Sequence, residues 1–188
     1  MKKLLDRIKL CMLPPPQKRS LPYECYWEDS ILAQEQERIF SNQWLGLGRS
    51  DRLENPGEYE AFELCGQALV LIRNQDKELR LYANTCRHRG AKLLDGTGQC
   101  QAISCPFHGW TYSLDGNLKH AKTMAENPSF DFAEHSLIEY KLKELQGFLF
   151  GFLGNKPTDL SNQLGNFSEL HQPWSMNELV TTRRASFE

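Results

Sequence analysis

Two short segments, each carrying one cysteine and one histidine, constrain this chain more than any other feature of its sequence. They read Cys86-Arg87-His88-Arg89-Gly90 and, after a short interval, Cys105-Pro106-Phe107-His108-Gly109-Trp110-Thr111-Tyr112. Two soft thiolates and two imidazoles form a four-ligand set that only a few metal centres use. The glycine after each histidine suits a loop whose backbone passes close to a cofactor, where a Cβ atom would be an obstruction. The sequence therefore predicts a metal centre held by Cys86, His88, Cys105 and His108.

Two kinds of metal centre fit these ligands. One is a structural zinc site; the other is a Rieske 2Fe-2S cluster, in which two thiolates bind one iron and two imidazoles bind the other. Zinc sites usually take two like ligands from one turn, as Cys-x(2–4)-Cys or His-x(3–5)-His. Here each segment supplies one Cys and one His, as two matching loops around a Rieske cluster must. The spacing favours the 2Fe-2S cluster, and a zinc-stabilised binding module is the alternative.

The same two segments resemble the N-terminal Rieske domain of the catalytic (alpha) subunit of Rieske non-haem iron ring-hydroxylating oxygenases. A second stretch, from Trp27 to Trp44, is similar to the helix that precedes this domain in those subunits. Cytochrome bc-type Rieske proteins carry an extra cysteine in each loop, and the matching positions here are Ala91 and Phe107. They also have a serine after the second His-Gly, where this chain has Trp110. The resemblance therefore points to the oxygenase class and covers residues 23–188.

The expected ligand roles follow from the Rieske reading. Cys86 and Cys105 would bind the inner iron as thiolates, and His88 and His108 would each bind the outer iron through one ring nitrogen. Three residues flank these ligands: Arg87, Arg89 and Trp110. They are expected to set the electrostatics and solvent access of the cluster, with ordinary surface charge and core packing as the alternative explanation.

The composition is that of a globular protein of 188 residues, with 40% hydrophobic and 24% charged residues. A net charge of -2 gives no reason to expect binding to nucleic acid. Four further cysteines are scattered without a disulfide-framework spacing: Cys11, Cys25, Cys65 and Cys100. They read as reduced thiols in a reducing compartment. Asp6, Arg7 and Lys9 interrupt the apolar N-terminus. With no secretory leader and no transmembrane segment, we expect a cytoplasmic protein.

The N-terminal part predicts two helices. Residues 2–12 place their aliphatic side chains on one face, and three prolines at 14–16 stop the helix. This basic segment suits a docking extension, with a membrane surface as the alternative. Residues 21–27 read as extended chain. A second helix capped by Asp29 or Ser30 and reaching Trp44 is expected to lie against the sheet.

From residue 45 onward the hydrophobic period changes to two and turn residues recur, which predicts mainly antiparallel β structure. The candidate strands are residues 44–48, 59–64, 67–73, 79–83, 103–105, 110–113, 140–145 and 148–153. The candidate turns are 65–66, 74–77, 114–117 and 146–147. Residues 120–138 read as a loop with one helical turn. The fold class is antiparallel Rieske-type sheets with a small cluster-binding subdomain.

The expected organisation has four parts. Residues 1–22 form an extension, 23–47 a helix packing on the sheet, 48–156 the Rieske domain, and 157–188 a loop-rich tail, of which 178–188 is a candidate strand. The resemblance implies that this tail leads into a catalytic domain whose mononuclear iron is held by two His and one carboxylate. His120, His135 and His171 do not form the matching pair. We therefore expect the mononuclear Fe(II) only in a further domain or a partner.

The sequence thus predicts an oxidoreductase component that relays electrons from a reductase or ferredoxin to a mononuclear non-haem iron that activates dioxygen. The acceptor would be an oxygenase catalytic domain or a neighbouring subunit, with a homo-oligomer as the full-length assembly. The alternative is a complete small protein that acts as a stand-alone Rieske-type electron carrier. Neither the substrate nor the choice between monooxygenase and dioxygenase follows from these residues.

Overall fold

The computed structural model of the chain describes residues 2–122, 124, 126–183 and 185. It divides into two compact units, Met1–Ser41 and Asn42–Glu188. In the first unit, α1 (Lys2–Lys9) continues into a 3-10 helix, Leu10–Met12; a second 3-10 helix, Tyr23–Tyr26, precedes α2 (Asp29–Arg38). The groove between α1 and α2 is lined mainly by aliphatic side chains: Leu4, Leu5, Ile8, Ile31 and Ile39.

The structure tests the helices expected in this unit. The helical prediction for residues 2–12 is confirmed, but the extended chain predicted for residues 21–27 is wrong. There, local bonds such as Cys25 N to Pro22 O (3.0 Å) wind the chain into a 3-10 turn. The second helix begins at Asp29, so Asp29 and Ser30 do not cap it, and it ends at Arg38 rather than Trp44. Its packing on the sheet stays a prediction.

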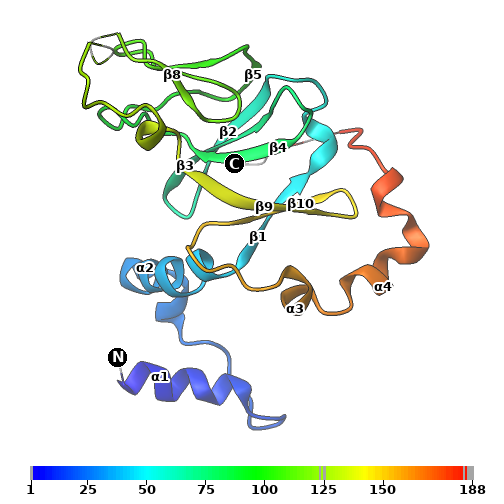
Figure 1. The fold of residues 1–188 in the computed structure, drawn as a ribbon. Helices are drawn as coiled ribbons and strands as arrows, with labels where there is room; N and C mark the ends of the chain where they lie inside the picture. Colours follow the sequence, from blue (N-terminus) through cyan, green and yellow to red (C-terminus); the bar gives the residue numbers. More distant parts are fainter. Residues whose placement is uncertain (1, 123, 125, 184, 186–188) are drawn as a thin grey trace. The chain divides into compact units, whose positions relative to one another are not determined.

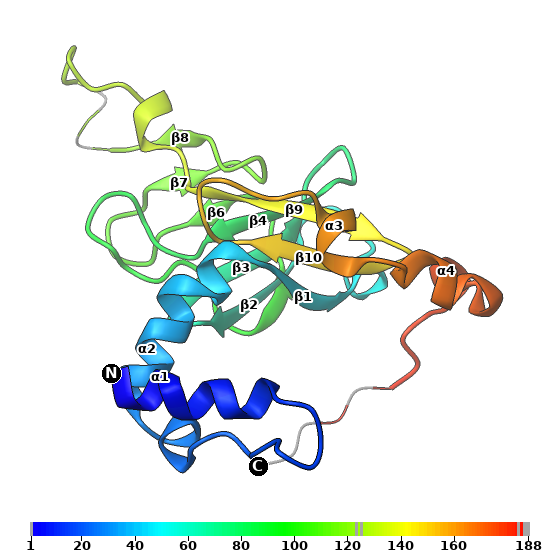
Figure 2. The same cartoon turned by 90° about the horizontal axis from the view of Figure 1, so that it is seen from below.

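The second unit is built on a seven-stranded antiparallel sheet in the order β1-β10-β9-β4-β3-β2-β5 (Figures 1 and 2). Its strands are β1 (Trp44–Arg49), β2 (Glu58–Leu64), β3 (Gln67–Arg73), β4 (Leu79–Ala83), β5 (Thr97–Gln99), β9 (Glu139–Leu145) and β10 (Phe148–Phe152). All of its pairings are antiparallel, which confirms the predicted sheet class.

Two tight turns fix the register of this sheet. Cys65 and Gly66 join β2 to β3, and Gln146 and Gly147 join β9 to β10. All four residues have positive φ, between 51° and 78°, as the central residues of a two-residue hairpin turn require. The sequence-based turns at 65–66 and 146–147 are therefore confirmed.

A smaller sheet, in the order β6-β7-β8, carries the second metal-ligand motif, whereas the first motif follows β4 of the large sheet. It comprises β6 (Ile103–Ser104), β7 (Thr111–Tyr112) and β8 (Leu118–His120). The predicted turn at 114–117 joins β7 to β8, with Gly116 N bonded to Ser113 O at 2.9 Å. Val70, Ile72 and Tyr82 of the large sheet belong to the same buried cluster as Tyr112 and Trp110. One face of the large sheet thus supports the small sheet.

The opposite face of the large sheet has its own core. It contains Leu69, Leu71 and Leu81, which alternate along β3 and β4 with the residues that face the small sheet. All of these side chains are nearly or completely buried. β3 is therefore covered on both faces, which explains why its sequence, QALVLIR, is a continuous apolar run rather than an alternating pattern.

The C-terminal tail is more helical than the sequence predicted. α3 (Leu160–Leu164) and α4 (Phe167–His171) are followed by two 3-10 helices, Gln172–Trp174 and Met176–Glu178. The strand expected at 178–188 is wrong for residues 178–183 and 185, none of which lies in a strand. The rest of that candidate strand, residues 184 and 186–188, lies outside the described residues.

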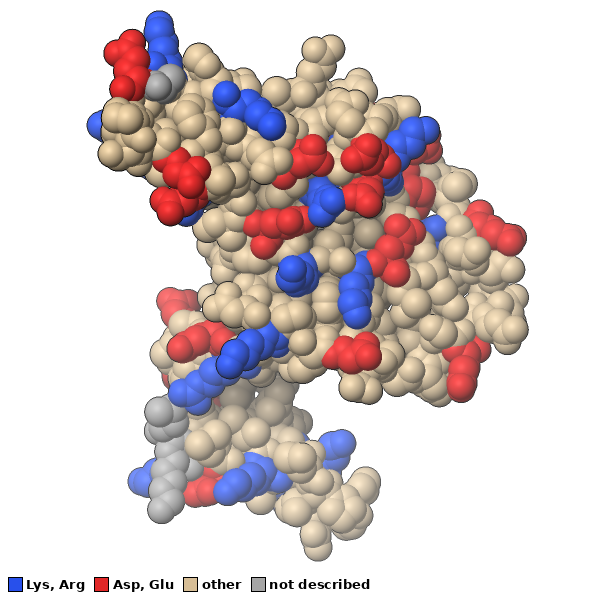
Figure 3. Space-filling view, viewed as in Figure 1, with Lys and Arg blue, Asp and Glu red and all other residues tan. Residues whose placement is uncertain are grey.

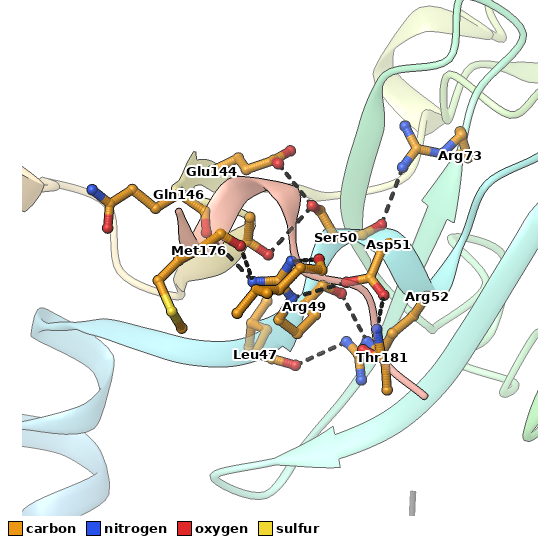
Figure 4. A network of polar contacts seen from close by, with 12 residues as sticks. Leu47, Arg49, Ser50, Asp51, Arg52, Arg73, Glu144, Gln146, Met176 and Thr181 are labelled. Atoms are coloured by element: carbon orange, nitrogen blue, oxygen red, sulfur yellow. Dashed lines mark hydrogen bonds and ion pairs between the residues drawn. The ribbon is translucent and has the colours of Figure 1, made fainter. Parts of the chain in front are cut away.

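A polar network holds this tail to the end of β1 (Figure 4). The Arg49 guanidinium donates to Met176 O at 2.8 Å and also to Leu179 O, while Thr181 N donates to an Asp51 carboxylate oxygen at 2.6 Å. Burial acts to raise the pKa of Asp51, but the hydrogen bonds from Thr181 and Arg49 outweigh it and hold this pKa below its usual value. The carboxylate is therefore charged at neutral pH and fixes the tail by charge-assisted bonds.

Charged side chains of both signs lie on the surface of the second unit. On the face drawn in Figure 3, basic and acidic side chains of its described residues are interspersed. Arg80, for example, pairs with Glu139 at 3.0 Å. Within the described part of the chain, no helix combines the length and apolar character needed to cross a membrane.

Candidate metal centre

Two loops with the same backbone conformation carry the four expected ligands. The first loop follows β4, and the second joins β6 to β7. In each loop the cysteine N–H donates to the carbonyl of the residue five positions later. The cysteine carbonyl accepts from the N–H of the glycine four positions later. These bonds run from Cys86 N to Ala91 O (2.8 Å), Gly90 N to Cys86 O (3.0 Å), Cys105 N to Trp110 O (2.8 Å) and Gly109 N to Cys105 O (3.1 Å). Gly90 and Gly109 close the loops with φ of 74° and 67°.

The structure brings the four predicted ligands together. Cys86, His88, Cys105 and His108 line one cavity of about 370 Å³, together with Arg89, Gly90, Ala91 and Phe107. The cysteines are 2% and 4% exposed, whereas His88 is half-buried and His108 is exposed. The two imidazole rings lie 4.7 Å apart at 80°. The sulfur atoms therefore lie on the protein side of the cavity and the imidazoles on the solvent side.

One nitrogen of the His88 ring has no hydrogen-bond partner within the described residues. This nitrogen, Nδ1, is buried, although buried polar atoms are normally paired. Burial lowers the pKa of His88, and the nearby His108 and Arg89 lower it further. The ring is therefore neutral at neutral pH, and the lone pair on a ring nitrogen is available to a metal.

The size of the cavity fits a cluster better than a single ion. Among the residues that the structure describes, no group of three or more His, Cys, Asp or Glu side chains is placed to hold one metal ion. A zinc ion would need its four ligand atoms within about 2.0–2.3 Å of one point. The cavity of about 370 Å³ that the four side chains line would leave room for a 2Fe-2S cluster.

Tyr112 is a site residue that the sequence reasoning missed. Its hydroxyl lies 3.3 Å from Cys86 Sγ and accepts a 3.0 Å bond from Arg87 N. Burial and the contact with Cys86 raise the pKa of Tyr112 well above its usual value, so the phenol keeps its proton. With its oxygen accepting from Arg87, the remaining O–H can donate to the sulfur. The alternation of side chains along β7, which buries Tyr112, was the signal that could have identified it.

Replacing Tyr112 by phenylalanine should lower the reduction potential of the centre without emptying it. A hydrogen bond to a ligand sulfur stabilises the more negative reduced form, and a neutral hydrogen bond contributes about 0.5–1.5 kcal/mol, which equals roughly 20–60 mV for one electron. A potentiometric titration of Tyr112→Phe measures this. Tyr82→Phe is the matched control, because its buried hydroxyl bonds only to a backbone oxygen, at Leu114. An unchanged or higher potential in Tyr112→Phe would contradict the assignment.

The three flanking residues differ in their surroundings. Trp110 is 3% exposed, and its indole stacks on the His88 ring at 4.8 Å and 13°. Arg89 lines the cavity and is exposed, as is Arg87. Their expected effects on electrostatics and solvent access stay predictions.

None of the remaining histidines is among the residues that line the cavity. His120 is exposed in β8. His135 Nδ1 bonds Asp131 O at 2.8 Å, and His171 Nδ1 bonds Phe167 O at 2.7 Å. Each of the last two rings has one nitrogen engaged by a local carbonyl.

Comparison with known proteins shows the family of this region of the chain. The family model for the Rieske [2Fe-2S] domain matches residues 43–136, which is 94 of the 188 residues. The carnitine monooxygenase oxygenase subunit of Escherichia coli (strain K12) is 34% identical over 151 residues, covering 80% of this chain and 40% of that protein. The glycine betaine monooxygenase oxygenase subunit of Chromohalobacter salexigens is 30% identical over 162 residues, covering 85% of this chain and 36% of that protein.

A solved structure has a similar fold. The quaternary ammonium Rieske monooxygenase CntA in complex with its substrate L-carnitine matches with a TM-score of 0.77 and 33% identity, covering 83% of this chain and 45% of that one. The chain therefore spans less than half the length of the relatives it matches.

Proposed function

Because the chain belongs to the Rieske [2Fe-2S] domain family, we propose that it relays single electrons within an oxygenase system. The donor is a reductase or ferredoxin, and the acceptor is a mononuclear non-haem iron that activates dioxygen in a catalytic domain or a neighbouring subunit. The observation that carries this proposal is the cavity in which two buried thiols face two imidazoles. The similarity of residues in this region to oxygenase subunits supports the oxygenase setting.

We assign each ligand to one of the two irons by how deeply its side chain is buried. Cys86 and Cys105, which are buried, hold the inner iron as thiolates, and His88 and His108 hold the outer iron through ring nitrogens. When bound, the cluster supplies one-electron chemistry. The protein keeps both sulfurs away from water, donates a hydrogen bond to Cys86 through Tyr112, and presents His108 at the surface. None of the six cysteines forms a disulfide, which supports a reducing compartment such as the cytoplasm.

A stand-alone electron carrier is the second candidate. Its cluster would use the same four ligands, so the cavity fits this candidate equally well. In both candidates this chain takes up and passes on electrons, and the two differ in whether an oxygenase iron receives them.

The test is a metal and turnover analysis of the purified 188-residue protein. We expect about two irons and two acid-labile sulfides per chain, with an absorption spectrum that one electron bleaches. Added ferrous iron, dioxygen, a reducing system and L-carnitine or glycine betaine should give reduced cluster and no product. Bound zinc without labile sulfide would establish the zinc-stabilised module instead. Product formation that depends on His120, His135 or His171 would refute a pure relay role.

A further inference from the structure

The two ligand imidazoles are held very differently. His108 is exposed, with the exposed Phe107 as its aromatic neighbour at 6.2 Å. His88 is half-buried, and its ring lies nearly parallel to the indole of Trp110, at 4.8 Å and 13°. The lone pair of a ring nitrogen lies in the plane of the imidazole, so the stacked indole limits the tilt of His88 toward a metal. Trp110 belongs to the second loop, and it therefore orients a ligand of the first.

Trp110 is in turn held by two aromatic rings from outside both ligand loops. Phe130 meets the indole edge-on at 5.6 Å and 77°, and His135 meets it at 5.7 Å and 73°. Edge-to-face contacts of this kind are favourable arrangements for aromatic rings. The indole is thus in contact with His88 and with Phe130 and His135.

Phe130 and His135 also fix each other. Their rings stack at 4.3 Å and 30°, and His135 Nδ1 bonds Asp131 O at 2.8 Å. Just beyond them, Leu137 is buried and its N–H bonds Gly116 O at 2.8 Å, which ties this segment to the turn between β7 and β8. Phe130 and His135 are therefore held in place by several contacts, and the proposed electron relay does not yet give them a role.

We propose that Phe130 and His135 are positioning residues for the metal centre: they hold Trp110 against His88, fix the orientation of that ring and keep water from its side of the cluster. This inference rests on the proposed ligation of His88. Two ferric ions, two sulfides and two thiolates sum to no net charge, whereas the reduced cluster carries one negative charge. Water admitted beside His88 would therefore stabilise the reduced form and raise the potential.

The experiment compares Phe130→Leu and His135→Leu with His171→Leu. His171 is a matched control because it stacks on Phe167 at 4.2 Å and bonds Phe167 O at 2.7 Å, in α4 rather than beside the ligand loops. Both test variants should retain the cluster, show a more positive midpoint potential, and lose iron to a chelator about two- to tenfold faster. His171→Leu should match the wild type. His135→Phe, which keeps a ring against Trp110, should restore the wild-type potential in large part.

Each outcome decides the question. Unchanged potential and chelation rate in both Phe130→Leu and His135→Leu, with the cluster present, would overturn this inference alone and leave the relay proposal intact. Equal changes in His171→Leu would also overturn it. If a leucine variant does not fold, a wild-type potential in His135→Phe together with a raised potential in His135→Gln supports the inference, and equal potentials refute it. A wild-type protein without iron and sulfide would remove both proposals.

Discussion

Replacing Cys86 or Cys105 by serine is expected to abolish the iron-sulfur centre, with at least about tenfold less iron and labile sulfide per chain than the wild type. An alkoxide is a poor substitute for a thiolate toward ferric iron, and neither cysteine has a neighbouring thiol that could replace it in the cavity. Both side chains are also buried, so the empty variant would carry a hydroxyl in an apolar setting. Iron and sulfide assays with the visible absorption spectrum measure the loss.

Cys100→Ser is the matched control. Cys100 packs against the same buried cluster of residues as Cys86 and Cys105, and burial raises the pKa of its thiol, but it does not line the cavity. This variant should keep a full complement of iron and sulfide. Full absorbance in Cys86→Ser, or equal loss in Cys100→Ser, would show that the ligands are assigned wrongly.

Gly57→Ala should be among the most destabilising single substitutions in the chain. Gly57 has φ of +85°, and a Cβ atom there would lie 2.1 Å from the carbonyl oxygen of Cys100. The same glycine accepts a 3.0 Å bond from Cys100 N and donates a 2.8 Å bond to Arg73 O, so the backbone on both sides is fixed. Relief of the clash must break these bonds. We expect a loss of about 3–5 kcal/mol, or roughly 6–20 °C in melting temperature.

Gly66→Ala separates the two causes of this loss. Gly66 has a similar φ of +73°, but nothing lies within 4 Å of its added Cβ. It should cost only about 1–2 kcal/mol, the penalty for a left-handed backbone. Thermal unfolding followed by circular dichroism measures both variants. Equal melting temperatures for Gly57→Ala and Gly66→Ala would mean that the contact with Cys100 does not constrain the fold.

Most strands of the large sheet could be predicted from the sequence because the local order of apolar and turn residues indicates them. The bounds of β3 and β4 are as predicted: β3 is a mainly apolar run, β4 has apolar residues on both sides of Arg80, and turn residues separate the two strands. β5 and β8 were missed because they carry little hydrophobic pattern: β5 is wholly exposed and contains Gly98, and two of the three residues of β8 are exposed. The existence of β5 depends on backbone pairing with β2, which is a long-range property that local patterns do not record.

The tail shows a different limit of prediction. Its prolines, asparagines and glycine predict loops, yet α3 forms with Asp159 as its N-cap, which accepts a bond from Ser161 N at 3.0 Å. Leu160 is buried against Trp44, Phe150 and Phe152 of the sheet. Such tertiary packing stabilises a helix of five residues that would not form alone. The four expected ligands do lie around one cavity, because the chemistry of their residue types could be recognised without knowledge of the fold; their role as iron ligands stays a prediction.

The two ligand loops have the same pattern of backbone hydrogen bonds, and their first residues, Cys86 and Cys105, are 19 positions apart. Superposing one loop on the other places Phe107 on His88 and Arg89 on His108. The histidines therefore occupy successive, not equivalent, places in a repeated frame. His88, at the third position of its loop, is half-buried, whereas His108, at the fourth position of the other loop, is exposed. Two loops with similar backbones thus present their histidines at different depths.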